Sequence, residues 1–183
     1  MVPPKRDSEI RGETVMRAVL ISIRPEWVEK ILAGEKTLEV RKNRPNMKTP
    51  FKCYIYCTNS DVAMGMWGKR GKVVGEFVCD KITWLTHVGF SGLLGIRLVA
   101  MKDRYTIDDS FGFSESCLTT PQIEKYLGGK DGYAWHISNL EIYDVPLELT
   151  VFRKPELPTG LRYEEDAIKR SPQSWCYVRD RNE

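Results

Sequence analysis

Short apolar runs with strand-like character recur along the chain and are separated by turn-forming residues. At 18–23 the run is apolar and β-branched throughout, which is typical of a buried strand. Other runs are rich in aromatic and β-branched residues, which favour strands because these side chains pack well on a pleated, half-buried surface. Strands are therefore predicted over 18–23, 51–58, 72–79 and 174–178.

Two further segments add to the predicted sheet. Residues 36–41 alternate, with Leu38 and Val40 on one face and polar residues on the other, as in a half-buried strand. Residues 133–143 predict either one long strand or two strands separated by a bend. The pattern therefore gives about six strands in all.

Two segments carry helix signals at both ends. Pro25 opens the first, because a proline at the first helical position forfeits no hydrogen bond, and Gly34 is expected to end it in the left-handed conformation. In the second, Thr119 or Thr120 is expected to cap a helix over 121–127 that ends at a glycine pair.

The order of these elements shows no regular strand–helix–strand alternation. We therefore predict an α+β fold, a small mixed β-barrel of about six strands with two or three flanking helices. Between 84 and 113 the periodicity weakens and glycines recur, which predicts an insertion with little regular structure or a short helix. We expect a single domain over 17–178, preceded by a flexible arm at 1–16 and followed by a tail at 179–183.

Composition narrows the class of protein. The chain has 183 residues, of which 42% are hydrophobic and 29% charged, a globular rather than a disordered composition. No apolar run approaches the roughly 18 residues that a membrane helix needs, and the N-terminus has no apolar signal core. We therefore expect a cytoplasmic protein with no membrane partner.

The five cysteines form no C-x-x-C pair, and the chain has only two histidines. This pattern contains no recognisable zinc spacing, so no metal site is predicted and the thiols are expected to be reduced. Nothing in the sequence indicates an organic cofactor.

The net charge of +3 is distributed unevenly. Residues 41–72 contain eight basic residues and one acid, Asp61, so this segment is +7 and the rest of the chain is −4. Clustered lysine and arginine side chains favour a phosphate-bearing partner, because they release its counterions. The alternative is a solvated loop that only keeps the protein in solution.

One segment has a more specific pattern. Residues 20–42 read LISIRPEWVEKILAGEKTLEVRK, a helix that ends in Gly-x-Lys followed by a strand with Glu and Arg, here Gly34, Lys36, Glu39 and Arg41. This resembles the opening of the ASCH domain, a family of PUA-like barrels. Further similarity, greatest to ASCH proteins of phages and prophages, lies at 73–79, 133–149 and 172–178.

The resemblance implies a ligand and a reaction. Members of the superfamily are thought to bind RNA in a cleft between the first helix and the barrel, so RNA or a nucleotide-like ligand is the expected partner. Some small bacterial members are amidohydrolases that deacylate acetylcytidine, and Lys36 falls on their mechanistic lysine. This chain has Glu39 where they carry threonine, and their catalytic acid aligns roughly with Glu115. A ribonuclease acting through the same residues is a further alternative.

The chemistry of the lysine depends on its surroundings. A desolvated Lys36 would serve as a nucleophile or a general base, and Glu39 would take its proton or pair with Lys36 or Arg41. In a regular strand Lys36 points away from Thr37, Glu39 and Arg41. Only a bend after Gly34 would bring these residues into one cleft.

Glu76 lies in an apolar run, where it would share a face with Val74 and Val78. An unpaired carboxylate there would cost several kcal/mol, so it needs a partner. We expect either a salt bridge to Arg41 or Lys36, or a catalytic role.

Other candidates for ligand binding come from the ends of the predicted elements. Ser22 and Arg24 stand where the first helix begins, a position that favours anions. Trp67 is the best aromatic candidate for stacking on a base, because its glycine-rich surroundings seldom bury apolar residues. The remaining candidates are Lys42, Arg44, Lys69, Arg70, Trp135, His136 and Ser138.

The sequence thus predicts a binding domain for RNA or a modified nucleoside, with Lys36, Glu39 and Arg41 framing the cleft and segment 41–72 contacting phosphates. The alternatives are an amidohydrolase or ribonuclease that uses the same cleft. A third is a phage-derived interaction module without a nucleic-acid partner.

Overall fold

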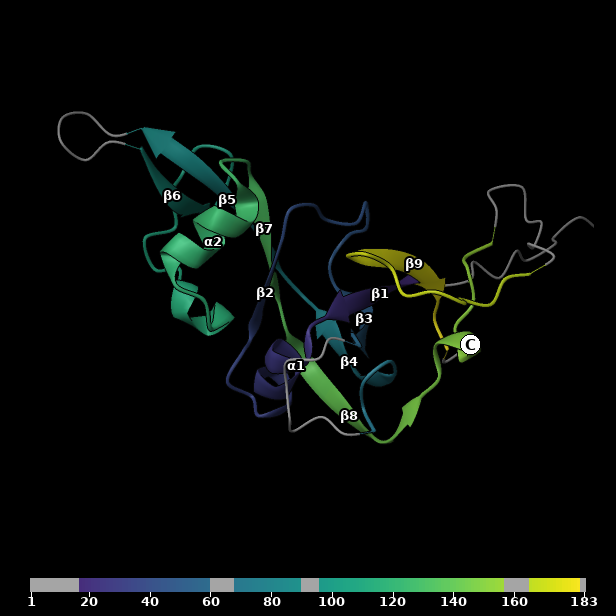
Figure 1. The fold of residues 1–183 in the computed structure, drawn as a ribbon. Coiled ribbons are helices and arrows are strands. Elements are labelled where there is room, and N and C mark those ends of the chain that lie inside the picture. Colours follow the sequence, from purple (N-terminus) through teal and green to yellow (C-terminus); the bar gives the residue numbers. More distant parts are fainter. Residues whose placement is uncertain (1–16, 60–67, 90–95, 157–164, 182–183) are drawn as a thin grey trace, which may run out of the picture.

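The computed structural model describes residues 17–59, 68–89, 96–156 and 165–181 (Figure 1). The expected arm at 1–16 and Trp67 lie outside these residues. Nine strands form two sheets within them, and two α-helices and two 3₁₀-helices complete the fold. The α+β class is confirmed, and the strand pairing among the described residues does not join the two sheets into a closed barrel.

The first sheet is mixed. Its order is β8 (Ser138–Leu147), β4 (Val73–Cys79), β3 (Phe51–Cys57), β1 (Arg17–Ile23) and β9 (Trp175–Arg179). The β1–β3 pair is parallel and the other pairs are antiparallel. A parallel pair needs a crossover, which here contains the first helix and one strand of the second sheet.

The second sheet is antiparallel. Its order is β2 (Leu38–Arg41), β7 (Gly132–His136), β5 (Ile82–Gly89) and β6 (Ile96–Met101). β7 continues into β8 with Ile137 between them, so one stretch of chain crosses both sheets (Figure 1). The alternative of two strands separated by a bend is therefore the correct one for 133–143.

The segment at 84–113 corrects a prediction. We expected little regular structure there, but it contains most of β5, all of β6 and the start of the 3₁₀-helix η2 (Phe113–Ser116). Its glycines obscured the alternation, whereas β5 pairs with β7 on one side and with β6 on the other, and these hydrogen bonds fix both strands. These two strands account for part of the difference between about six predicted strands and nine observed.

The helices follow their sequence signals. α1 (Pro25–Leu32) has proline in its first turn, and Gly34 follows it with φ +73°. α2 (Thr120–Leu127) begins with a full capping box in which Thr119 and Gln122 bond each other's backbone N–H groups. A short 3₁₀-helix, η3 (Leu149–Val151), follows β8.

Apolar side chains form three buried clusters. The largest lies between the sheets and includes Ile21, Phe77 and Trp135. A second covers the other face of the first sheet around Tyr54. The third joins α2 to the second sheet. The chain stays in the fold beyond 178, because β9 reaches Arg179 and Asp180 contacts Tyr54 and Lys52.

Candidate functional site

Three charged side chains meet in the interior between α1, β2 and η2. The Lys36 ammonium donates to the carbonyls of Leu38 (2.6 Å) and Ser116 (2.7 Å) and lies 3.2 Å from Glu39 Oε2. The other oxygen of Glu39 lies 2.9 Å from Arg41 Nη2. Lys36, Glu39 and Arg41, here called the charged cluster, are only 2%, 7% and 8% exposed.

Arg41 ties the cluster to the first sheet. Its Nη2 donates to the Ser22 carbonyl (2.7 Å) and its Nη1 to Ser174 Oγ (3.3 Å). Its Nε is buried and has no hydrogen-bond partner among the described residues. Such an orphaned donor costs about 1–3 kcal/mol, so it requires an explanation beyond packing.

The bend that the sequence required after Gly34 is present. The N–H groups of Glu35 and Lys36 both donate to the Lys30 carbonyl, and strand β2 begins only at Leu38. Lys36 therefore lies outside the alternation of the strand and turns to the same side as Glu39. The structure brings together the three residues that framed the predicted cleft.

Glu115 lies next to this cluster. Its carbonyl accepts the N–H of Thr37 at 2.9 Å, and its carboxylate lies 3.3 Å from Thr37 Oγ1. The neighbouring Ser116 supplies an acceptor for Lys36. Among the catalytic candidates, Lys36, Glu39 and Glu115 are thus close in space.

Two aromatic residues border the charged cluster. The Trp27 ring lies 5.6 Å from the Lys36 ammonium, and the Lys42 ammonium lies 5.2 Å from the Tyr126 ring. Burial is the main cause of a raised pKa for Tyr126, and the charges of Arg41 and Glu39 act on it in opposite directions. Tyr126 is still 40% exposed, so it stands between the cluster and solvent.

Glu76 belongs to a different network. It lies 3.1 Å from Lys52 Nζ and accepts a hydrogen bond from Tyr143, on the face of the first sheet that carries Tyr54. The expected salt bridge to Arg41 or Lys36 is wrong. Pairing irregularities along β4 place Val74 in the core between the sheets, on the face opposite Glu76, so the simple alternation does not hold.

Three candidates from β7 and β8 are dispersed. Trp135 is fully buried in the core, and no group of the described segments forms a hydrogen bond with its Nε1. His136 pairs with Asp80 at 2.6 Å, and Ser138 donates to the Val78 carbonyl. In the ladder with β2, His136 is the neighbour of Leu38, whereas Trp135 is the neighbour of Glu39, so His136 faces away from the charged cluster.

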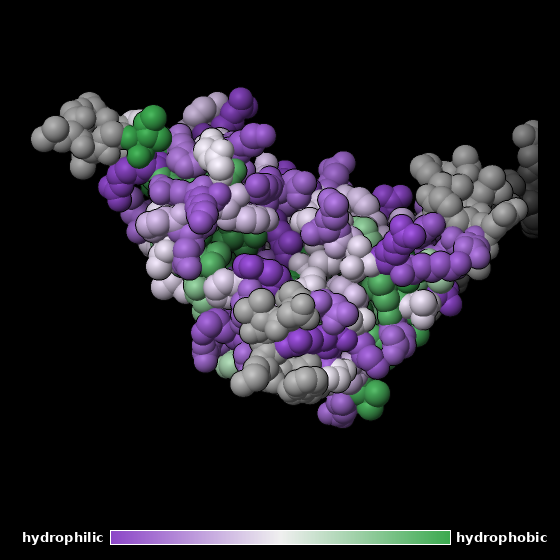
Figure 2. Space-filling model, in the orientation of Figure 1, coloured by the Kyte–Doolittle hydropathy of each residue, from purple (hydrophilic) through white to green (hydrophobic). Residues whose placement is uncertain are grey.

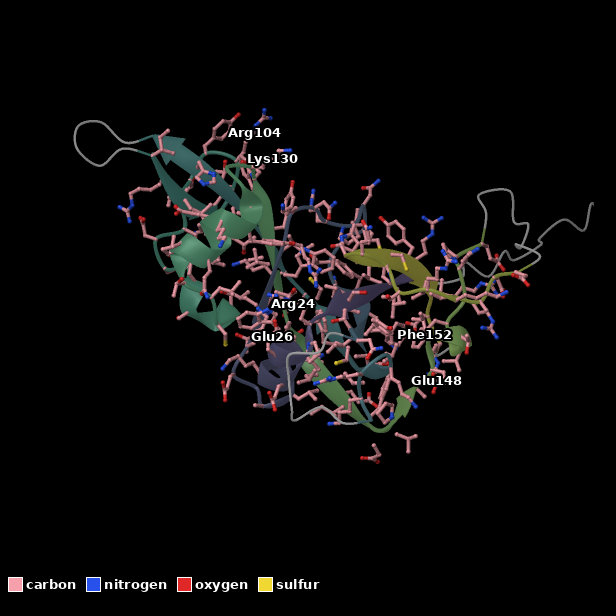
Figure 3. The ribbon with its side chains drawn as sticks, in the orientation of Figure 1. Arg24, Glu26, Arg104, Lys130, Glu148 and Phe152 are labelled. Carbon is pink, nitrogen blue, oxygen red and sulfur yellow. The ribbon has the colours of Figure 1, made fainter. Side chains whose placement is uncertain are left out.

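The start of α1 is held by protein groups. Ser22 Oγ donates to the Pro172 carbonyl (2.6 Å), and Arg24 lies 3.1 Å from Glu26. Figure 3 shows the Arg24 and Glu26 side chains beside α1. The second oxygen of Glu26 is buried and has no hydrogen-bond partner within the part of the chain that the structure describes.

The basic segment 41–72 does not form one surface. Arg41 is buried, Lys52 pairs with Glu76 and Asp180, and Lys72 pairs with Glu148. Arg44 and Lys48 line a groove at the surface. In the space-filling view, hydrophilic residues predominate over the front of the molecule, with small apolar areas among them (Figure 2).

Two residues around the cluster, Ser116 and Tyr126, were missed from the sequence. The carbonyl of Ser116 contacts it from a segment far along the chain, and Tyr126 reaches it from α2. Of these residues, only Tyr126, an aromatic side chain in the capped helix, gave a signal that the sequence could have used. Within the described residues, no group of three or more potential ligands could hold a metal ion, and no helix is long and apolar enough to cross a membrane.

Comparisons with known proteins identify a family match and similar folds. Residues 21–90 match the family model described as ASCH domain. A Ser-to-Ala variant of ASCH from Zymomonas mobilis is 18% identical, with 88% of each chain covered and a TM-score of 0.53. A Tyr-to-Phe variant of the same protein is 20% identical, with 88% of this chain and 90% of that chain covered and a TM-score of 0.50. The likeness is one of fold, and the comparison with curated proteins finds no match.

Proposed function

Because this chain carries an ASCH domain over residues 21–90, we propose that it binds single-stranded RNA or a nucleotide-like ligand beside the charged cluster. The observation that supports this function is a set of three buried charges with one orphaned donor, Arg41 Nε. Buried ion pairs contribute little net stability, since desolvation offsets their attraction. Their presence at the junction of the two sheets favours a functional role.

The border of the cluster suits a base and a phosphate. Trp27 and Tyr126 offer aromatic faces, on which a nucleobase stacks with little dependence on sequence. The exposed cations Arg24 and Lys42 lie at the same border and would contact phosphate oxygens. The buried charged cluster would hold these bordering side chains in position.

Salt dependence tests this proposal. Binding of a fluorescein-labelled hexanucleotide RNA is measured by anisotropy at increasing KCl concentration, with wild type and Lys42→Glu. Affinity should fall by about 0.7 in log K per phosphate contact for each log unit of salt, and Lys42→Glu should weaken binding. Lys169→Glu reverses the charge of another exposed lysine, in the segment before β9, and is the control. Binding that is independent of salt would contradict the proposal.

A hydrolase is the second candidate, since Lys36, Glu39 and Glu115 lie together. Hydrolysis of acetylcytidine would consume one water and release cytidine and acetate. Three acceptors surround the Lys36 ammonium, so Lys36 must first give up one of them and lose a proton before it can serve as a nucleophile or as a general base for the attacking water.

The purified protein is incubated with acetylcytidine and, separately, with labelled RNA, and products are separated by chromatography. Release of cytidine or of RNA fragments that Lys36→Met abolishes and Lys30→Met retains would establish the enzyme. No product from folded wild type would leave binding as the function.

A further inference from the structure

The face of the second sheet that carries the charged cluster extends well beyond it. In the strand ladders Arg41 is the neighbour of Tyr133, Tyr133 of Trp84, and Trp84 of Met101. Neighbours across a ladder project from the same face of the sheet. A row of side chains therefore leads from the buried arginine across all four strands to the edge strand β6.

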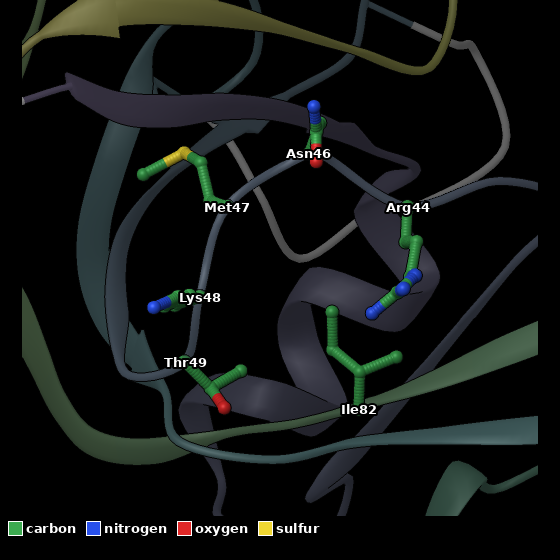
Figure 4. Close-up of a pocket in the computed structure, with 6 residues that line it drawn as sticks. All are labelled: Arg44, Asn46, Met47, Lys48, Thr49 and Ile82. Atoms are coloured by element: carbon green, nitrogen blue, oxygen red, sulfur yellow. The ribbon is translucent and has the colours of Figure 1, made fainter.

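A groove lies over this row. It consists of two adjoining pockets of about 660 and 340 Å³, which share Arg44 and Ile82. Figure 4 shows the loop 44–49 curving around the larger pocket, with Arg44 and Ile82 extending toward one another. The smaller pocket is lined by Trp84, Tyr133 and the turn after β6. These volumes are in the range of small-ligand sites.

The groove is strongly cationic. Its lining includes Arg44, Lys48, Lys102 and Arg104 and a single acid, Asp103. The carboxylate of Asp103 already accepts the N–H groups of Tyr105 and Thr106 (2.8 and 2.9 Å). Across the part of the chain that the structure describes, no carboxylate forms an ion pair with the four cations of the lining.

Aromatic faces lie between these charges. The indole N–H of Trp84 donates to Asp131 (3.0 Å), which fixes the orientation of the ring. The guanidinium of Arg44 lies 5.8 Å from the Tyr133 ring. Both rings are only half-buried. Fixed aromatic faces beside guanidinium groups are the usual platform for unstacked bases.

We propose that this groove holds the continuation of a single RNA strand whose adjacent nucleotides lie beside the charged cluster. Bases stack on Tyr133 and Trp84, and phosphates contact Lys48, Lys102 and Arg104. A duplex would keep its bases stacked on each other and could not use the aromatic row. The inference rests on the proposed function and assigns Trp84 and the turn at 101–104, which line one side of the groove, to RNA recognition.

The test uses the full chain and a labelled twelve-nucleotide single-stranded RNA. The groove variant is Lys102→Glu/Arg104→Glu, in an exposed turn, and the matched control is Lys169→Glu/Arg170→Glu. The groove variant should lose at least about tenfold in affinity, and its salt slope should fall by about 1.4, the value for two lost phosphate contacts. Trp84→Leu, checked for folding by circular dichroism, should lose at least about fivefold.

The outcomes separate the two proposals. If wild type binds the RNA and the groove variant binds equally well, the groove is excluded while binding at the cluster stands. If the groove variant is weakened and Lys42→Glu is not, the groove stands and the cluster does not. A duplex of equal length bound as tightly as the single strand would overturn the single-strand assignment. Absence of any RNA binding by wild type would end both proposals.

Discussion

At the scale of single residues, burial gives the charged cluster its properties. Glu39 balances two cations, Lys36 and Arg41, with one carboxylate oxygen for each. The two carbonyl acceptors of Lys36 complete its shell. Because almost no water reaches these groups, loss of one partner leaves another charge uncompensated in a medium of low polarity.

Replacement of this carboxylate tests the cluster directly. Glu39→Gln keeps the volume and removes the charge, so it should lower the free energy of unfolding by about 3–5 kcal/mol. Glu35→Gln is the matched control, because Glu35 forms only an exposed pair with Lys30 and its loss should cost less than about 1 kcal/mol. Urea denaturation of both variants measures the difference, and equal losses would show that the cluster is not energetically coupled.

The cysteines are expected to differ in reactivity because they differ in burial. Cys53, Cys57 and Cys79 are buried, and desolvation raises the pKa of Cys57 to about 11 and that of Cys79 to about 12. Burial also raises the pKa of Cys53 and, to about 11, that of Cys176. The thiolate is the reactive species, so these four thiols should react slowly.

In a disulfide-exchange assay at pH 8, the native protein should therefore show one fast thiol, Cys117, which lies next to Ser116. Cys117→Ser should abolish the fast phase, and all five cysteines should react after denaturation. Several fast thiols in the native protein would contradict the burial described for the first sheet.

At the scale of elements, backbone contacts decide where the strands fit. Gly75 lies where β4 meets β8, and a Cβ atom there would stand 2.4 Å from the Glu141 carbonyl oxygen. The pairing of these strands shifts on both sides of this point. Only glycine permits so close an approach of two backbones.

Gly75→Ala should force the strands apart and cost about 1–3 kcal/mol, as overpacking of a core does. Gly89→Ala is the control, since a Cβ atom there meets no atom of the described residues within 4 Å and its cost should stay within about 0.5 kcal/mol. Thermal unfolding of the two variants gives the comparison. An unchanged midpoint for Gly75→Ala would show that the irregularity relaxes freely.

The capping box of α2 offers a second test at this scale. Thr119→Ala removes the side-chain acceptor at the helix start and should cost about 1 kcal/mol. Thr150→Ala, on an exposed 3₁₀ turn, serves as the comparison and should be nearly neutral. A loss of stability well above about 1 kcal/mol would indicate that the cap is also needed to pack α2, the helix that carries Tyr126, against the second sheet.

At the scale of the whole molecule, a polar network around Lys52 joins the first sheet to the end of the chain. Lys52 lies 3.1 Å from both Glu76 and Asp180, and Tyr54 donates to Asp180. Burial would lower the pKa of Lys52, but its hydrogen bonds to the two carboxylates outweigh this and raise it. Burial also raises the pKa values of Tyr54 and Tyr143.

These shifts predict loss of stability in alkaline solution. A group whose pKa is raised on folding contributes stability below its unfolded pKa and loses it as the pH rises toward the folded value. For the thiols this loss begins near pH 9 and for Cys79 continues to about 12, and the two tyrosines and Lys52 add to it above about pH 10.

The urea concentration at the unfolding midpoint should therefore decrease as the pH is raised from 8 to 10.5. Cys79→Ala should have a lower midpoint at pH 8 but a smaller decrease with pH, because one buried thiol is removed. Midpoints that do not change with pH would contradict these assignments.

The sequence by itself determined the local features of this protein. The proline and glycine signals predicted α1, the threonine cap predicted α2, and the alternation of Leu38 and Val40 predicted β2. The resemblance to the ASCH family, carried by the Gly-x-Lys pattern, also predicted that Lys36, Glu39 and Arg41 lie together, which needed a bend after Gly34. Backbone stereochemistry and side-chain periodicity act over a few residues, so these features are readable without a fold.

Only the tertiary structure decided the long-range partners. Glu76 pairs with Lys52 instead of the cluster, and Ser174 and Ser116 reach the cluster from distant segments. Two stretches of the segment at 84–113 became strands because β5 pairs with β7 and β6 pairs with β5. A polar side chain or a strand edge accepts any partner of suitable chemistry, and the packing of the two sheets selects which one it meets.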